Sequence, residues 1–354
     1  MQYITSTPLV LPADALIIEK ERGKQVYLEK ENETDVIEFI LLGFSNSPQL
    51  DIPLFLVFLV IYLLTVLGNM GMMFIIRTDP RLHTPMYIFL SNLSFSDVCF
   101  VSVSVPKLLQ TLLSNTKAIS FAGCMTQLHF LIYFNTTEIF LLSAMAYDRY
   151  VAICNPMRYL LVMNSRVCLQ LIISAWTVSL FNSLAQTLLI VRLPFCHSNK
   201  INHFSCDIPP LLKLSCSDTS LNEMYIFTVC VILAGSSFFL ILASYIRIVS
   251  AILKINSAEG RHKAFSTCVS HLTCVTLFYG AGFIRYVRPS TSYSLDQDRF
   301  VCVLYSIVTP MLNPVIYSLR NNDVKEAMRR IMRKVSFIAE KGSDSNQLFF
   351  ITKR

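Results

Sequence analysis

Residues 53–76 read PLFLVFLVIYLLTVLGNMGMMFII, a run without a charged side chain that is long enough to cross the hydrocarbon core of a membrane. Further apolar runs of similar length follow it. The predicted spans are Pro53–Ile76, Met86–Leu112, Gly123–Met145, Val167–Val191, Met224–Ile246, Ala264–Val287 and Phe300–Leu319. The composition agrees, because 53% of the residues are hydrophobic, only 15% are charged and the mean hydropathy is +0.52. We therefore expect an all-α membrane protein, a bundle of seven transmembrane helices.

Three regions are expected along the chain: a polar tail over residues 1–52, the seven-span domain over residues 53–319, and a short region over residues 320–354. In this last region, apolar side chains recur at helical spacing from Val324 to Val335, with Lys and Arg between them. This pattern is typical of an amphipathic helix that lies on an anionic membrane surface.

The charges of the loops orient the bundle, because cytoplasmic loops retain Lys and Arg. An excess of basic residues in alternate loops and in the C-terminal region places the N-terminus outside the cell and the protein in the plasma membrane. The net charge of +7 then follows from this topology in the lipid bilayer, and it gives no reason to expect a nucleic-acid partner. In the outer tail, Asn32 begins the tripeptide Asn-Glu-Thr and is the expected glycosylation site.

The cysteines divide by compartment, because disulfides persist on the oxidising side of the membrane. The cysteines expected on the outer side are Cys124, Cys196, Cys206 and Cys216. Four cysteines allow three pairings. A bridge from Cys124 to Cys206, with Cys196 closed onto Cys216, would fold the long loop over the bundle as a lid. A zinc site that uses His197, His203 and Cys206 is the alternative, which the even number of outer cysteines disfavours.

Two acids fall inside predicted spans, Asp97 and Glu138. Ionisable groups are costly in a membrane and are therefore candidates for function. If both face the interior, they could share a proton, or they could bind a cation with help from Asn69 and Asn313. A sodium ion is the one cofactor that we consider, and a protonated, hydrogen-bonded pair is the alternative. The chain has neither a nucleotide-binding glycine pattern nor an HExxH motif, and we expect no enzyme activity.

Several short motifs occur in order along the chain. They are Gly68-Asn69, LHTPMY at 82–87, LSFSD at 93–97, MAYDRYVAIC at 145–154, Ser244-Tyr245, KAFSTC at 263–268 and PMLNPVIYSLRN at 310–321. At these spacings the chain resembles a rhodopsin-like G-protein-coupled receptor, and specifically an olfactory receptor, over about residues 32–335. The resemblance implies a receptor that binds a small volatile odorant and activates a stimulatory heterotrimeric G protein, which raises cyclic AMP. In similar receptors a sodium ion near Asp97 favours the inactive state.

The resemblance also implies a switch at the cytoplasmic end. Its residues are Asp148, Arg149, Tyr150, Tyr245, Asn313, Pro314 and Tyr317. Arg149 keeps its charge, and adjacent Asp148 can partner it while the bundle is closed. Pro314 leaves the backbone carbonyl four residues earlier without its donor, which makes a plausible hinge. The two later tyrosines would swing inward on activation, although tyrosines at such positions also serve as membrane anchors.

The expected ligand pocket is apolar with a few polar groups. Leu131 stands where amine receptors carry an aspartate, and the seventh span has no lysine to bind retinal. Tyr279, in the Phe-Tyr-Gly triplet typical of olfactory receptors, is the expected floor. Helical periodicity adds the remaining candidates, which are Phe134, Asn135, Thr136, Gly282, Phe283, Tyr286 and Ser306. Such a pocket suits a small neutral ligand. A lipid or peptide receptor of the same fold is the main alternative, and a channel or transporter is a weaker one.

Overall fold

The computed structural model describes residues 37–44, 48–114, 116–196, 198–286 and 295–333. Within these residues, seven helices are long and apolar enough to cross a membrane. They are Gln49–Thr78, Pro85–Leu113, Phe121–Cys154, Ser165–Val191, Ser220–Leu253, Ala258–Ile284 and Arg299–Ser318. Each overlaps one predicted span, so the prediction of an all-α seven-helix membrane protein is confirmed. Asn32, the expected glycosylation site, lies outside the described residues.

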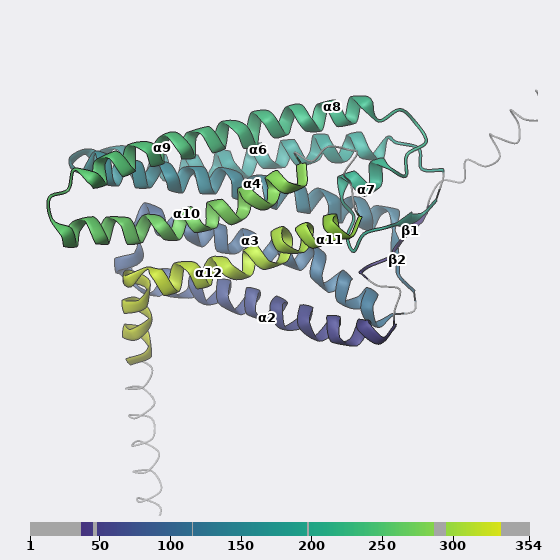
Figure 1. Ribbon diagram of the computed structural model, residues 1–354, viewed down its shortest axis with the longest axis horizontal. Coiled ribbons are helices and arrows are strands. Elements are labelled where there is room, and N and C mark those ends of the chain that lie inside the picture. The colour runs from purple at the N-terminus through teal and green to yellow at the C-terminus, as the bar shows by residue number, and fades with distance from the viewer. Residues whose placement is uncertain (1–36, 45–47, 115, 197, 287–294, 334–354) are drawn as a thin grey trace, which may run out of the picture.

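The spans pack side by side as a bundle (Figure 1). The first four are α2 (Pro48–Thr78), α3 (Pro85–Leu113), α4 (Phe121–Cys154) and α6 (Ser165–Val191). The fifth joins α8 (Ser220–Val229) to α9 (Ser236–Leu253) through a π-helical segment, Cys230–Gly235, and the sixth is α10 (Ala258–Tyr286). The seventh joins α11 (Leu295–Val303) to α12 (Thr309–Arg320) through a second π-helical segment, Leu304–Val308.

The outward faces of the bundle are apolar, as a lipid environment requires. On α2, Leu67 and Phe74 are 68% and 59% exposed, although both are large hydrophobic residues. The central helix α4 shows the opposite arrangement, since Leu141, Leu142 and Met145 are fully buried. The helices therefore bury the side chains through which they contact one another, and they expose hydrophobic side chains on the outside of the bundle.

A small sheet covers one end of the bundle, which we call the lid end (Figure 1). Its middle strand is β1 (Glu38–Leu41), which runs antiparallel to β2 (Ala118–Ser120) and parallel to β3 (Lys200–Ile201). Phe39 and Leu41 alternate with more exposed neighbours and are fully buried. The sheet, which the sequence did not predict, ties the N-terminal tail to two loops.

The opposite end of the bundle, which we call the switch end, carries two further helices. One is the short α5 (Tyr159–Val162). The other spans residues 322–333 and leaves the bundle at a steep angle (Figure 1). This second helix is amphipathic as predicted, because Val324 and Ala327 are fully buried whereas the basic positions are more exposed. That it lies on a membrane surface stays a prediction.

An ion pair fixes the last helix to the loop between α2 and α3. The Arg330 guanidinium lies 2.7 Å from the Asp79 carboxylate. Desolvation acts to raise the pKa of Asp79, but hydrogen bonds from Arg330 and from the backbone N–H of Arg81 outweigh it and hold this pKa below its usual value. The ionised form of Asp79 is thus the form that the folded chain favours.

Candidate functional site

A cavity of about 850 Å³ lies within the bundle toward the lid end, a size typical of small-molecule sites. Its walls are mainly apolar and come from α3, α4, α6, α10 and the fifth and seventh spans. The predicted residues that line it are Leu131, Asn135, Thr136, Tyr279, Gly282, Phe283 and Ser306. The side chain of Tyr286 lies outside the described part of the chain.

Phe134 was also predicted to face the pocket and does not line it. Its ring lies 6.2 Å from the ring of Trp176 on α6, in an edge-to-face arrangement. A helical residue next to a lining position points about a quarter turn away, and here that direction leads into the packing between α4 and α6.

Tyr279 forms part of the wall of the cavity. Its hydroxyl lies 2.7 Å from Ser237 Oγ on α9, so the phenol ring leans toward that helix. The cavity continues past it to Tyr245. That Tyr279 forms the floor of the ligand pocket stays a prediction, because Tyr245 also lines the cavity.

A chain of amide groups lines the cavity on the side of α6, and sequence reasoning missed it. Asn182 Nδ2 donates to Thr136 Oγ1 at 3.0 Å, and Gln186 Nε2 donates to Asn182 Oδ1 at 2.9 Å. Two amides four residues apart in an apolar span were the available signal, since they fall on one face of the helix. Asp207, which lies on the loop that covers the cavity, was also missed.

Two polar atoms that border the cavity are buried without a hydrogen-bond partner among the described residues, namely Ser104 Oγ and Asn135 Oδ1. Leaving such groups unsatisfied costs free energy, and most buried polar groups are paired. A ligand with a hydroxyl or carbonyl group could supply the missing partner. The cavity therefore suits a mostly apolar molecule that carries a hydrogen-bonding group.

Two disulfides hold the loop that roofs the cavity, and both have the pairing proposed from the sequence. Cys124 pairs with Cys206, with Cα atoms 5.4 Å apart, and Cys196 pairs with Cys216, at 5.9 Å. Cys206 is therefore committed to a disulfide and cannot bind zinc. In addition, His203 is hydrogen-bonded to Ser205, and His197 lies outside the described residues.

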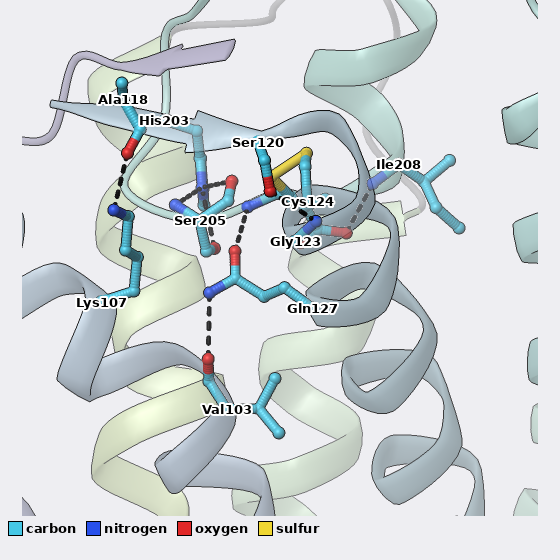
Figure 2. Close-up of a disulfide and its surroundings, with 12 residues drawn as sticks. Val103, Lys107, Ala118, Ser120, Gly123, Cys124, Gln127, His203, Ser205 and Ile208 are labelled. Atoms are coloured by element: carbon cyan, nitrogen blue, oxygen red, sulfur yellow. Dashed lines mark hydrogen bonds between the residues drawn. A yellow bond between two sulfur atoms is a disulfide. The ribbon is translucent and has the colours of Figure 1, made fainter. Parts of the chain in front are cut away.

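One glutamine on α4 reinforces this attachment (Figure 2). The side chain of Gln127 accepts a hydrogen bond from the backbone N–H of Cys206 at 2.8 Å and donates one to the carbonyl of Val103 at 3.0 Å. The amide thus bridges the roof loop, α4 and α3. The roof is consequently attached both covalently and through buried hydrogen bonds.

The two acids inside the spans lie in one cluster. Asp97 and Glu138 are 1% and 4% exposed and interact electrostatically, and Asn313 Nδ2 donates to Asp97 Oδ2 at 2.9 Å. Oδ1 of Asp97 and Oδ1 of Asn313 are buried without partners among the described residues, and so is Oδ1 of Asn69, whose amide nitrogen bonds to Pro310 three residues before Asn313. Oxygen donors of this kind suit a hard cation, so the residues fit a sodium ion.

Asn69 also completes the hinge at Pro314. The carbonyl that this proline leaves without a helical donor belongs to Pro310, and Asn69 Nδ2 donates to it at 3.0 Å. The preceding residue, Gly68, permits the approach, because a Cβ there would lie 3.1 Å from Pro314 Cγ. The motif Gly68-Asn69 on α2 therefore matches the segment of α12 around Pro314 in both shape and hydrogen bonding.

At the switch end, the expected ion pair between Asp148 and Arg149 is absent. Asp148 is 1% exposed and accepts a hydrogen bond from the Tyr159 hydroxyl at 2.8 Å. Arg149 Nε is buried without a hydrogen-bond partner among the described residues. Consecutive residues on a helix point in different directions, which explains why this pair does not form. Tyr150 is half-buried, and its ring lies 6.2 Å from that of Tyr147.

The two later tyrosines lie inside the bundle. Tyr245 and Tyr317 are 6% and 1% exposed, so they are not membrane anchors in this structure. The Tyr245 hydroxyl lies 2.8 Å from His271 Nδ1, while His271 Nε2 lies 3.1 Å from the carbonyl of Leu142. His271, which sequence reasoning missed, thus joins α4, α9 and α10 near Arg149.

Comparison with known proteins gives a consistent result. The family described as "Olfactory receptor" matches residues 58–335. "Olfactory receptor 5AR1" of Homo sapiens is 50% identical over 309 residues, which are 87% of this chain and 100% of that protein. "Olfactory receptor 5AP2" of Mus musculus is 52% identical over 305 residues, 86% of this chain and 96% of that protein. Among solved structures, squid rhodopsin matches with a TM-score of 0.63 at 17% identity over 81% of each chain, which shows the shared fold.

Proposed function

Because the chain belongs to the olfactory receptor family and is an odorant-sensing G-protein-coupled receptor, we propose that it binds small, mostly apolar volatile ligands in the cavity and activates a stimulatory heterotrimeric G protein to raise cyclic AMP. The observation that carries the proposal is the cavity itself, an apolar space of about 850 Å³ with unpartnered polar atoms at Ser104 and Asn135. A volatile alcohol or carbonyl compound has both an apolar body and one such polar group.

The charge of the lining supports a neutral ligand. Among the lining residues of the described chain, Asp207 on the roof loop is the one charged side chain, and Leu131 occupies the wall on α4. A cation bound deep in the bundle would have no carboxylate beside it in this wall. A neutral molecule loses less hydration on entering such a cavity.

The proposed orientation places the lid end outside the cell and the switch end in the cytoplasm, in the plasma membrane. Two disulfides at the lid end favour an oxidising compartment, and the basic residues of segment 322–333 favour the cytoplasm. Asn32 would then stand on the outer side, where glycosylation occurs.

A surface for the G protein is available at the switch end. Three large hydrophobic side chains in and beside α5 are exposed, and they lie after α4 has ended at Cys154. They are Met157, Leu160 and Leu161, which are 95%, 80% and 76% exposed. Exposed apolar residues outside a membrane span mark interaction surfaces. Tyr159 of this same segment is bonded to Asp148, so contact with Gα here could be transmitted directly to α4 and Arg149.

The buried cluster of Asp97, Glu138, Asn69 and Asn313 is the proposed site of a sodium ion, with a shared proton as the alternative occupant. Either one would compensate charge that is costly in the bundle interior. Asn69 also donates a hydrogen bond to the carbonyl of Pro310, so the proposed site is connected to the part of α12 around Pro314. Stabilising this arrangement would favour the closed, inactive state.

The proposal is tested by measuring cyclic AMP in cells that express the chain with a trafficking chaperone and the olfactory stimulatory Gα, against a panel of volatile odorants. We expect a dose-dependent rise in cyclic AMP that the variant Arg149→Ala abolishes. Silence toward all volatiles at confirmed surface expression, with a nanomolar response to a larger lipid or peptide, would contradict the proposal. Ion conduction without G protein would instead indicate a channel.

A further inference from the structure

The cavity opens through the side of the bundle. Among the described lining residues, each one with an exposed side chain comes from one of two segments, residues 227–242 of the fifth span and residues 276–283 of α10. Phe227 and Phe239 on the first segment are each 68% exposed, and Phe283 on the second is 66% exposed. A side chain that both lines a cavity and is exposed stands at its opening. The opening therefore lies between the fifth span and α10.

In the described part of the chain, the end of the cavity under the lid is more completely covered, and the roof-loop residue Asp207 there is partly buried. Its lining residues Ser205 and Ile208 are 2% and 6% exposed. Between them lies Cys206, which is fully buried and tied to α4 by its disulfide and by Gln127 (Figure 2). A ligand that entered from this end would have to displace the roof loop, which the disulfide holds against α4.

Both helices that border the lateral opening carry glycines, which have no side chain to fill the space there. Gly235 lies on the fifth span, and Gly280 and Gly282 lie on α10; all three line the cavity, and a Cβ placed on any of them meets nothing within 4 Å. Hydrogen bonds between the two helices occur at the pair Ser237 and Tyr279 and deeper in the bundle at Tyr245. Closer to the lid, the described residues show no hydrogen bond between the two helices.

The opening faces the hydrocarbon of the membrane. Val231, which is 55% exposed and lines the cavity, follows the start of α8 at Ser220. At about 1.5 Å per helical residue it lies roughly 16 Å below that start, which is well inside a core of about 30 Å. Acyl chains, and not water, therefore stand at the opening.

From these features we propose a lateral portal between the fifth span and α10, through which neutral, lipid-soluble ligands pass from the bilayer into the cavity. The inference rests on the proposed function, because it concerns how the odorant reaches its site. An apolar ligand concentrates in lipid before it binds, since transfer from water is favourable. Its effective concentration at the portal thus follows its partition into the membrane.

The test narrows the portal and measures the rates at which the ligand enters and leaves the cavity. Gly282→Leu and Gly235→Leu each place a leucine side chain on a helix that borders the portal. Gly71→Leu is the matched control, because a Cβ placed on Gly71 of α2 also meets nothing within 4 Å. Onset and washout of G-protein activation are followed in real time with a volatile that activates the parent chain, at matched surface expression. We expect both the onset rate and the washout rate to slow several-fold in the portal variants, whatever change in EC50 accompanies the substitution, because a barrier at the opening affects entry and exit equally.

Three outcomes would contradict the proposed portal. Both portal variants could reach the cell surface and show the onset and washout rates of the parent chain, or their EC50 could shift while these rates stay the same. The third outcome is equal slowing of both rates in the control variant Gly71→Leu. If one portal variant fails to reach the surface, the other decides the question. Failure of the proposed function would look different, because the parent chain itself would then respond to no volatile.

Discussion

The contact between Gly68 and Pro314 predicts opposite effects for two alanine substitutions on one helix. A Cβ at Gly68 would lie 3.1 Å from Pro314 Cγ, whereas a Cβ at Gly71 meets nothing within 4 Å. In both cases alanine gains about 1 kcal/mol of helix propensity over glycine. Only Gly68→Ala adds crowding, which costs about 1–3 kcal/mol in packed interiors. Since the propensity contribution cancels, Gly71→Ala should exceed Gly68→Ala in stability by about 1–3 kcal/mol.

The assay is thermal unfolding of the two purified variants beside the parent chain, in the same detergent. We expect the midpoint to fall in the order Gly71→Ala, parent, Gly68→Ala. Equal midpoints for the two variants would refute the reasoning, because they would show that α2 and α12 separate enough to admit a methyl group. A lowered midpoint for Gly71→Ala would refute the premise that this position is open.

Further outcomes are expected elsewhere in the chain. Arg149→Ala should abolish signalling at normal surface expression, whereas Cys206→Ser should lose surface expression; equal behaviour in flow cytometry and cyclic AMP assays would count against this division. Asn135→Leu should weaken the potency of a hydroxyl-bearing agonist up to about tenfold, the equivalent of one hydrogen bond, and leave an apolar analogue unaffected in dose–response curves. Because folding lowers the pKa of Asp79, its ion pair should stabilise the protein above the ordinary pKa of aspartate and lose this effect as the pH falls through the lowered value; unfolding of Asp79→Asn should lack this acid-dependent component. Asp97→Asn should abolish any difference between sodium and potassium buffers in agonist potency, and a sodium effect that persists would place the ion elsewhere.

Strong local patterns made much of the fold predictable. The spans follow from uncharged runs such as residues 53–76, because a bilayer tolerates little else over that length. The pocket residues on α4 could be predicted from helical periodicity, which placed Asn135 and Thr136 on the side of the helix that lines the cavity. Phe134 shows the limit of this argument, since a residue next to a cavity-facing position can point toward the cavity or toward a partner helix, and helical periodicity alone does not say which.

Apart from the disulfides, several features that depend on contacts between separate segments were not predictable. Strands as short as β2 and β3 carry no hydrophobic period, so nothing marked them as partners of β1. The hydrogen bond from Tyr159 to Asp148 joins α4 to a short loop helix, and only the folded loop brings the two groups together. The lateral opening depends on the spacing of two whole helices, which glycines permit but do not specify.

The order of the lid sheet has a consequence for biogenesis. Its middle strand, β1, precedes all seven spans, but its partners β2 and β3 follow α3 and α6 in the chain. Buried Phe39 and Leu41 therefore remain without their final neighbours until more than half of the chain has been synthesised. Pairings of such large sequence separation form late, since the intervening loop must be closed first. The sheet can thus be completed only after the first four spans have inserted and assembled. Until then, β1 in the N-terminal tail has no partner strands and stays exposed.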